Sequence, residues 1–294
     1  MSRRSLRAFI ALLVVIVTSV TGAAGSAGAA QRPGAVRTRV LRLIDHSRLA
    51  HFRNGTEGPR TLVTYVRYPS SGRPPYPLVV FVHGFALSPG DYASLLEAWA
   101  RAGYVVAAPE FPVEGQDAPG GPDQSDLPNE SGDLSFLISQ LTSRGNPLRP
   151  LIDPRRIAVA GHSDGGVAAL TAAYDRRDRD SRIGAALILS GAASPGFEPV
   201  GRGAPPILAV QGTADTVNAP STTAAYFERL NRPRFLLWLL GAPHLPPYSS
   251  KDQWAPFVAR ATTAFLDRYL RAGSLAALIS AGNHAGVARM EAHP

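Results

Sequence analysis

The chain has 294 residues, no cysteine and a formal net charge of +8. A chain without cysteine can form no disulfide, no thiolate metal site and no cysteine nucleophile. Although the charge is basic, no run of five or more Lys or Arg residues occurs and the aromatic residues are scattered, so the composition argues against a nucleic-acid-binding protein.

The first 30 residues are typical of a secretory signal peptide. Three arginines precede an apolar run over 8–20, and Ala27-Gly28-Ala29 is a possible cleavage site. The run is shorter than the roughly 20 residues that span a membrane, so we expect a secreted protein without a stable membrane anchor. The opening Ser-Arg-Arg partly matches a twin-arginine signal, which leaves the Sec and twin-arginine routes both open. Removing residues 1–30 lowers the charge from +8 to +5.

Residues 31–294 are expected to form a single domain, since a chain of this length can bury a sizeable core without disulfides. Two alternating segments, 36–43 and 60–68, predict the antiparallel edge of a sheet. From residue 76 onward strands alternate with helices. The expected strands are continuous apolar runs, typical of strands buried on both faces, over 76–82, 104–108, 156–160, 183–189, 206–211 and 234–240. The expected helices cover the apolar positions between 92 and 99 and the segments 133–143, 165–174, 219–230, 252–271 and 275–279.

This alternation predicts an α/β fold with a mostly parallel, doubly wound sheet and helices on both faces. Residues 111–131 are rich in Pro, Gly, Asp and Asn and predict a long loop, a kind of segment that often borders a functional site. Only residues 190–203 separate two of the strands, which is too short for a cap domain. The site is therefore expected to be open.

The pentapeptide Gly161-His162-Ser163-Asp164-Gly165 lies between an expected strand and an expected helix. This is the context of a nucleophile elbow, where a serine is held at a strained turn and flanking glycines prevent collisions. Ser163 is the candidate nucleophile, and His162 is expected to be structural. The motif alone is a modest signal in a chain with 28 glycines, so a base and a carboxylate must be found elsewhere.

Two later strands end in such partners. The strand over 206–211 leads to Asp215, and the strand over 234–240 leads to His244. A serine hydroxyl needs a base, and the base needs a carboxylate that fixes its tautomer. Each residue also has a plainer interpretation, Asp215 as a turn residue and His244 as a packed loop histidine. Since parallel strands end at the same edge of a sheet, we predict a triad of Ser163, His244 and Asp215.

The oxyanion of the tetrahedral intermediate needs backbone N–H donors. At an elbow of this kind they come from the residue after the serine and from the loop after the first central strand, which predicts the N–H groups of Asp164 and Phe85. The Asp164 carboxylate would oppose negative charge in such a hole. Its side chain is therefore expected to turn into solvent or to form a local hydrogen bond.

The motifs GHSDGG, HGF, GTAD and GAPH, which occur within residues 60–270, resemble those of the serine α/β-hydrolase superfamily. Their spacing is similar to that of bacterial dienelactone-hydrolase-like and acetylhydrolase-like esterases and, more distantly, of cutinase-type polyester hydrolases. Founding members of the first group use a cysteine nucleophile, which this chain lacks. The polyester hydrolases carry methionine after the serine and tryptophan after the next strand, where this chain has Asp164 and the tryptophan-free segment 191–197. The departure argues against a polyester substrate.

The sequence therefore predicts a secreted, monomeric serine hydrolase that cleaves carboxylic esters of a small molecule, lipid or polymer through an acyl-enzyme. No metal or organic cofactor is implied, since the chain has no H-E-x-x-H, P-loop or strand-linked dinucleotide motif. One alternative is an acyltransferase with the same triad, which a competing alcohol acceptor would reveal. Another is a cutinase-like polyester or lipid hydrolase, and a third is a non-catalytic binding protein on this fold, in which Ser163 would not react with a fluorophosphonate.

Overall fold

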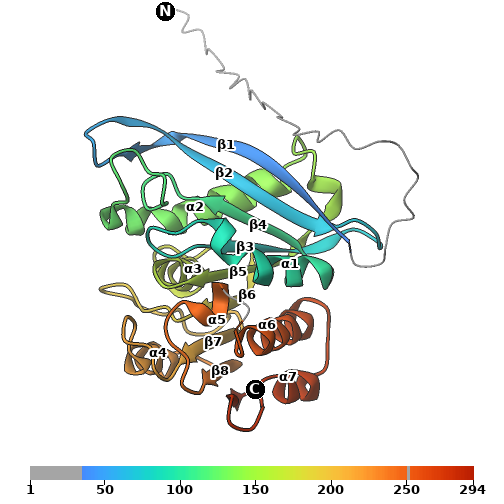
Figure 1. Cartoon of the computed structure of the whole chain (residues 1–294). Helices are drawn as coiled ribbons and strands as arrows, with labels where there is room; N and C mark the ends of the chain where they lie inside the picture. The colour runs from blue at the N-terminus through green and yellow to red at the C-terminus, as the bar shows by residue number, and fades with distance from the viewer. Residues whose placement is uncertain (1–34, 250–251) are drawn as a thin grey trace, which may run out of the picture.

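The computed structural model describes residues 35–249 and 252–294, so the predicted signal peptide, residues 1–30, lies outside the described residues. The described strands form one sheet in the order β1-β2-β4-β3-β5-β6-β7-β8-β9, shown in Figure 1. Neighbouring strands from β4 to β8 in this order are parallel, whereas β1, β2 and β9 pair in antiparallel fashion. The strands are β1 Val36–His51, β2 Glu57–Pro69, β3 Tyr76–Val82, β4 Val105–Glu110, β5 Ile152–His162, β6 Ile183–Leu189, β7 Ile207–Gly212, β8 Arg234–Leu239 and β9 Ala288–His293.

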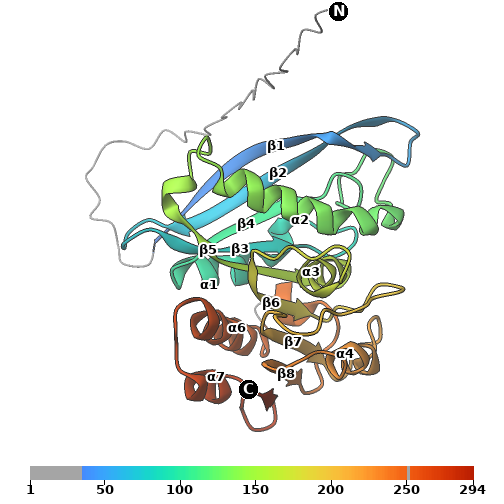
Figure 2. The same ribbon diagram turned by 180° about the vertical axis from the view of Figure 1, so that it is seen from behind.

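Helices cover both faces of the sheet, because successive strand side chains point to opposite faces. On β3, Val80 belongs to a core shared with α2, α3 and α4, while Phe81 belongs to a core shared with α1, α6 and α7. Figure 2 shows the face covered by α2 and α3. The helices are α1 Ala93–Arg101, α2 Leu127–Thr142, α3 Asp164–Tyr174, α4 Pro220–Phe227, α5 Pro246–Ser249, α6 Ala255–Leu270 and α7 Leu275–Ala281.

The predicted fold class is confirmed. Strands β3 and β6 have the bounds expected from the sequence, and no helix or strand lies in the segment 190–206 between β6 and β7, so the site carries no cap domain there. Among the described residues, no helix is both long enough and apolar enough to cross a membrane.

The expectation of a loop over residues 111–131 is wrong at its C-terminal end. A short 3-10 helix over Gln124–Asp126 leads directly into α2, which begins at Leu127, six residues before the predicted start at Asp133. Pro128 lies in the first turn of the helix, where proline is tolerated. Four polar residues of this segment, Glu114, Asp126, Glu130 and Ser131, are instead buried, and Asp126 has a charged partner inside the protein.

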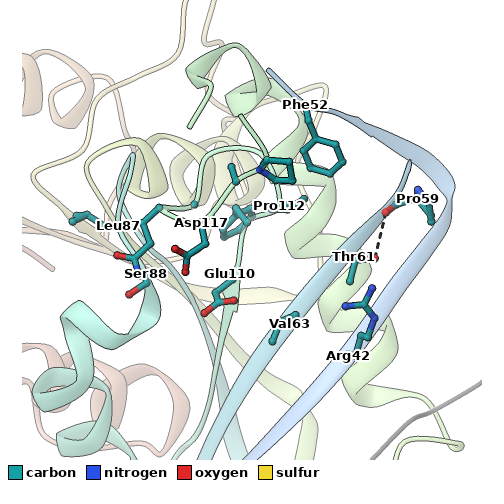
Figure 3. Close-up of a pocket in the computed structure, with 15 residues that line it drawn as sticks. Arg42, Phe52, Pro59, Thr61, Val63, Leu87, Ser88, Glu110, Pro112 and Asp117 are labelled. Carbon is teal, nitrogen blue, oxygen red and sulfur yellow. Dashed lines mark hydrogen bonds between the residues drawn. The ribbon is translucent and has the colours of Figure 1, made fainter. Parts of the chain in front are cut away.

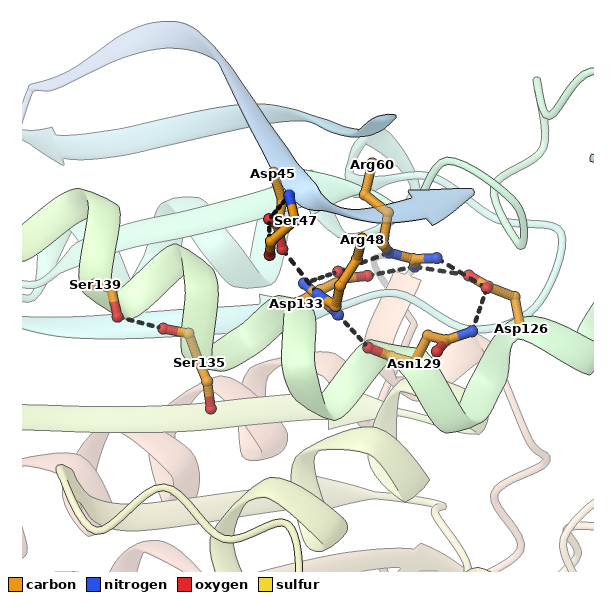
Figure 4. Close-up of polar contacts among 9 residues, drawn as sticks. All are labelled: Asp45, Ser47, Arg48, Arg60, Asp126, Asn129, Asp133, Ser135 and Ser139. Atoms are coloured by element: carbon orange, nitrogen blue, oxygen red, sulfur yellow. Dashed lines mark hydrogen bonds and ion pairs between the residues drawn. The ribbon is translucent and has the colours of Figure 1, made fainter. Parts of the chain in front are cut away.

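The main partner is Arg60 of β2, whose side chain is fully buried between the sheet and α2 (Figure 4). Its guanidinium donates to Asp126 at 2.7 and 2.9 Å and to Asp133 at 2.5 and 2.8 Å. Arg48 of β1 reaches Asp133 at 2.7 Å and Asp45 at 2.7 Å. These ion pairs attach the antiparallel edge to α2, and no apolar pattern in the sequence signals them.

The C-terminal strand β9 was not predicted. Its sequence, ARMEAH, has no continuous apolar run, yet it pairs with β8 over six positions from Leu239↔Ala288 to Arg234↔His293. β9 lies at the edge of the sheet, with a neighbouring strand on one side only. Its sequence therefore need not show the continuous apolar run of a central, buried strand. The same argument explains why β1 extends to His51, past the predicted end at Leu43.

Candidate active site

Ser163 lies at the sharp turn that joins β5 to α3. Its backbone angles are φ 56° and ψ −121°, a conformation that is rare and costly for a residue with a side chain. The turn is packed so closely that a Cβ atom added at Gly161 would collide with the carbonyl of Gly165. A Cβ atom at Gly165 would collide with the carbonyls of Val82 and His83. The structure therefore has the elbow geometry that the pentapeptide predicts.

Asp215 and His244 are hydrogen-bonded to each other. Asp215 follows β7, has only 4% of its surface exposed, and accepts a hydrogen bond at Oδ2 from His244 Nδ1 at 2.8 Å. The other carboxylate oxygen accepts from the N–H groups of Val217 and Asn218, both at 2.9 Å. Burial acts to raise the pKa of Asp215, but the hydrogen bonds from His244 and the backbone outweigh it and lower the pKa. A charged Asp215 holds the Nδ1–H tautomer of His244, which leaves Nε2 able to accept a proton.

Gly84 brings the predicted oxyanion turn, residues 83–87, against the nucleophile. A Cβ atom added at Gly84 would lie 3.3 Å from Ser163 Cβ. Within the turn the Leu87 N–H donates to the Gly84 carbonyl at 3.2 Å, and Ala86 takes the left-handed conformation with φ 58°. Phe85, the predicted donor, is 39% exposed. The turn is thus a tight loop packed against Ser163.

His162 is buried, as expected for a structural residue, and it joins the two halves of the site. The Gly84 N–H donates to the Tyr92 hydroxyl at 3.1 Å, and this hydroxyl lies 2.8 Å from His162 Nδ1. The other ring nitrogen, Nε2, lies 3.1 Å from the carbonyl of His244. Since that carbonyl can only accept, Nε2 carries the proton and Nδ1 accepts from Tyr92. Burial lowers the pKa of His162 to about 3, so the ring is neutral.

The role of Tyr92 was missed at the sequence level. In the sequence it is one of the apolar positions of an expected helix, and its ring is indeed fully buried. Its hydroxyl, however, links the oxyanion turn to the loop that carries His244. Because Tyr92 and His162 are 70 positions apart, no local motif contains this contact.

The Asp164 side chain takes one of the two arrangements that we expected. Its carboxylate accepts a hydrogen bond from Gln124 Nε2 at 2.5 Å, so the segment before α2 holds it. The Asp164 N–H, the predicted oxyanion donor, lies at the first position of α3. Across residues 35–249 and 252–294, no group of three or more His, Cys, Asp and Glu side chains could hold a metal ion.

Two pockets flank these residues. One, of about 460 Å³, lies between β2 and the segment after β4 and reaches the oxyanion turn at Leu87 and Ser88 (Figure 3). The other, of about 630 Å³, lies beside α3 and is lined in part by Gln124, Val167 and Thr171. Val167 is one helical turn after Ser163, and its N–H donates to the Ser163 carbonyl at 3.0 Å. Neither pocket is lined by Ser163, Asp215 or His244 themselves.

A model of the alpha/beta hydrolase family matches residues 79–291. The chain belongs to this family. Among solved structures, it is similar to a ferulic acid esterase from Streptomyces cinnamoneus, with 24% identity, a TM-score of 0.66 and coverage of 85% of this chain and 94% of the other. At 24% identity, this structural similarity supports the shared fold alone. A comparison with curated proteins finds no match.

Proposed function

We propose that this alpha/beta hydrolase is a secreted serine esterase, with Ser163 as nucleophile, His244 as general base and Asp215 as the carboxylate that orients the base. The observation that carries the proposal is the 2.8 Å hydrogen bond from His244 to a buried, charged Asp215. A histidine held in one tautomer at the edge that carries a strained serine has no evident structural need for that arrangement. It does meet the needs of acyl transfer.

In the proposed reaction, Ser163 Oγ attacks the ester carbonyl and His244 Nε2 takes its proton. The negative charge on the former carbonyl oxygen is stabilised by the N–H groups of Phe85 and Asp164. When the intermediate collapses, the carbon–oxygen bond to the alcohol breaks and His244 donates the proton to the leaving alcohol. A water molecule then attacks the acyl-enzyme by the same route, which releases the carboxylic acid and restores Ser163.

The substrate class rests on the open site and on the structural neighbour. No cap covers the serine, and the two flanking pockets provide room for an acyl group and an alcohol group of appreciable size. A ferulic acid esterase shares the fold, so hydroxycinnamate esters belong in the substrate panel beside simple aliphatic esters. Asp164 and the tryptophan-free loop after β6 make polyester film the weakest candidate.

The test uses the purified mature protein, residues 31–294, beside its Ser163→Ala variant. Wild-type protein should hydrolyse a series of p-nitrophenyl esters and should be labelled at Ser163 by a fluorophosphonate, and the variant should lose about 10³-fold or more in kcat and all labelling. A competing alcohol acceptor separates hydrolysis from acyl transfer. Absence of both hydrolysis and labelling in the folded wild type would overturn the proposal.

A further inference from the structure

Two buried glutamates lie between the oxyanion turn and α2. Glu114, in the segment after β4, and Glu130, on α2, are both fully buried. Their carboxyl groups lie close enough to interact, and no donor from the described residues reaches any of the four oxygen atoms. Since buried polar groups are almost always satisfied, the two carboxyl groups must satisfy each other, and that requires a proton between them.

The surroundings of the pair favour the protonated form. The charged groups that face it come from four parts of the chain: Asp123 and Asp126 before α2, Asp133 on α2, Asp164 on α3 and Arg60 on β2. The single cation in this set, Arg60, already pairs with two of the aspartates (Figure 4). Burial, together with the neighbouring acids, raises the pKa of Glu114 to about 8. The same two causes raise the pKa of Glu130 well above its ordinary value.

The segment that carries Glu114 also supports the oxyanion turn. The Glu114 carbonyl accepts from the Ala86 N–H at 2.9 Å, next to Phe85. The Phe111 N–H donates to His83 Nε2 at 3.1 Å, and the Gly115 N–H donates to the Phe111 carbonyl at 3.0 Å. Segment 111–115 is thus bonded on one side to the turn, and on the other side its Glu114 side chain faces Glu130 of α2.

We propose that Glu114 and Glu130 are positioning residues whose shared proton holds the oxyanion turn in its working shape. The proposal rests on the proposed esterase function. When base removes the proton as water, two carboxylates face each other in a buried site and repel. Segment 111–115 then moves away from α2 and the Ala86–Glu114 hydrogen bond weakens. As a result, the Phe85 N–H no longer points at the oxyanion. Because the oxyanion exists only in the reacting state, kcat should fall while KM stays nearly constant.

The experiment compares pH profiles of kcat and KM for wild type, Glu114→Gln and Glu130→Gln between pH 6 and 10. A glutamine amide donates to the remaining carboxylate without a titratable proton. Each variant should keep kcat within about threefold of wild type at neutral pH and shift the alkaline decline upward by about one pH unit or more. Glu198→Gln is the matched control, because this exposed glutamate lies after β6 and lines neither of the two pockets. It should follow the wild-type profile.

Thermal unfolding at several pH values supplies a second readout. An acid whose pKa is raised on folding stabilises the protein fully at low pH, and this contribution is lost as the pH rises from the unfolded pKa through the folded pKa. Between pH 5 and 9 the Tm of wild type should therefore fall relative to that of Glu114→Gln by about 3 °C or more. Glu130→Gln provides the same comparison if Glu114→Gln does not fold.

The outcomes separate the two proposals. The role of the glutamate pair would be overturned if kcat declined at the same alkaline pH in wild type and in the folded variants. It would also be overturned if the Tm difference between wild type and variant did not depend on pH. Either result would leave the proposed esterase function intact. A wild type that neither hydrolyses esters nor reacts with a fluorophosphonate at any pH would overturn the proposed function. In that case the Tm comparison still tests the shared proton.

Discussion

Tyr92→Phe tests whether the hydroxyl that links the two halves of the site contributes to stability and catalysis. The ring should stay in place, because it is fully buried and packs on Phe81 with ring centroids 4.7 Å apart. Only the hydroxyl is lost. The buried Gly84 N–H then has no acceptor, and His162 Nδ1 has no donor. Each unsatisfied group costs about 1–3 kcal/mol, so the free energy of unfolding should fall by about 2–4 kcal/mol.

The effect on activity follows from the same two contacts. Gly84 precedes the predicted oxyanion donor Phe85, and losing one such donor altogether costs about 10²–10³ in rate. A donor that is displaced and not removed should cost less, so we expect kcat to fall about 10-fold. His162 freed at Nδ1 can also change tautomer and stop donating to the His244 carbonyl. That change adds to the loss without altering KM.

Urea denaturation followed by tryptophan fluorescence measures the free energy of unfolding, and p-nitrophenyl ester hydrolysis measures kcat. The matched control is Tyr226→Phe, since Tyr226 is an equally buried phenol on α4 whose hydroxyl lies outside this network. The control should change stability and kcat little. A contribution of the Tyr92 hydroxyl would be refuted if the free energy of unfolding of Tyr92→Phe matched that of wild type within about 0.5 kcal/mol. Equal losses of stability and kcat in Tyr92→Phe and Tyr226→Phe would refute it as well.

Four further substitutions, one of them a control, test other parts of the structure. Asp164→Ala should keep at least about a tenth of wild-type kcat, because only the N–H of this residue takes part in the proposed reaction; a larger loss in steady-state kinetics would show that the carboxylate takes part. Arg60→Met should lower the free energy of unfolding by about 3–5 kcal/mol, since it leaves the buried Asp126 without a cation and leaves Asp133 with Arg48 alone. The control is Arg155→Met, at an ion pair whose arginine side chain is 89% exposed, and it should change the free energy of unfolding by less than about 1 kcal/mol. Equal urea midpoints for Arg60→Met and Arg155→Met would contradict this expectation. Asp215→Asn should lower kcat by about 10³–10⁴-fold, because an amide no longer secures the tautomer of His244; a fall of less than tenfold would remove Asp215 from the proposed triad.

Much of the fold could be predicted because its signals are local. Continuous apolar runs mark strands buried on both faces, and β3 and β6 were predicted with the bounds that the structure has. The start of α2 was misplaced, because Asp126, Glu130 and Asp133 have the composition of a loop until Arg60 is placed beside two of them. Strand β9 was missed because its paired residues in β8 are 49 or more positions away in the sequence and its own sequence shows no strand pattern.

The same distinction between local and long-range signals applies to the candidate site. The elbow at Ser163 and the strand ends that carry Asp215 and His244 could be predicted, since glycine spacing and strand order follow from local sequence patterns. Two sets of contacts became visible only in the folded chain: Tyr92 and His162 connect Gly84 to His244, and Glu114 faces Glu130. These contacts join residues far apart in sequence in a water-excluded interior. There a hydroxyl or a carboxyl acquires its protonation state from neighbours that no local pattern identifies.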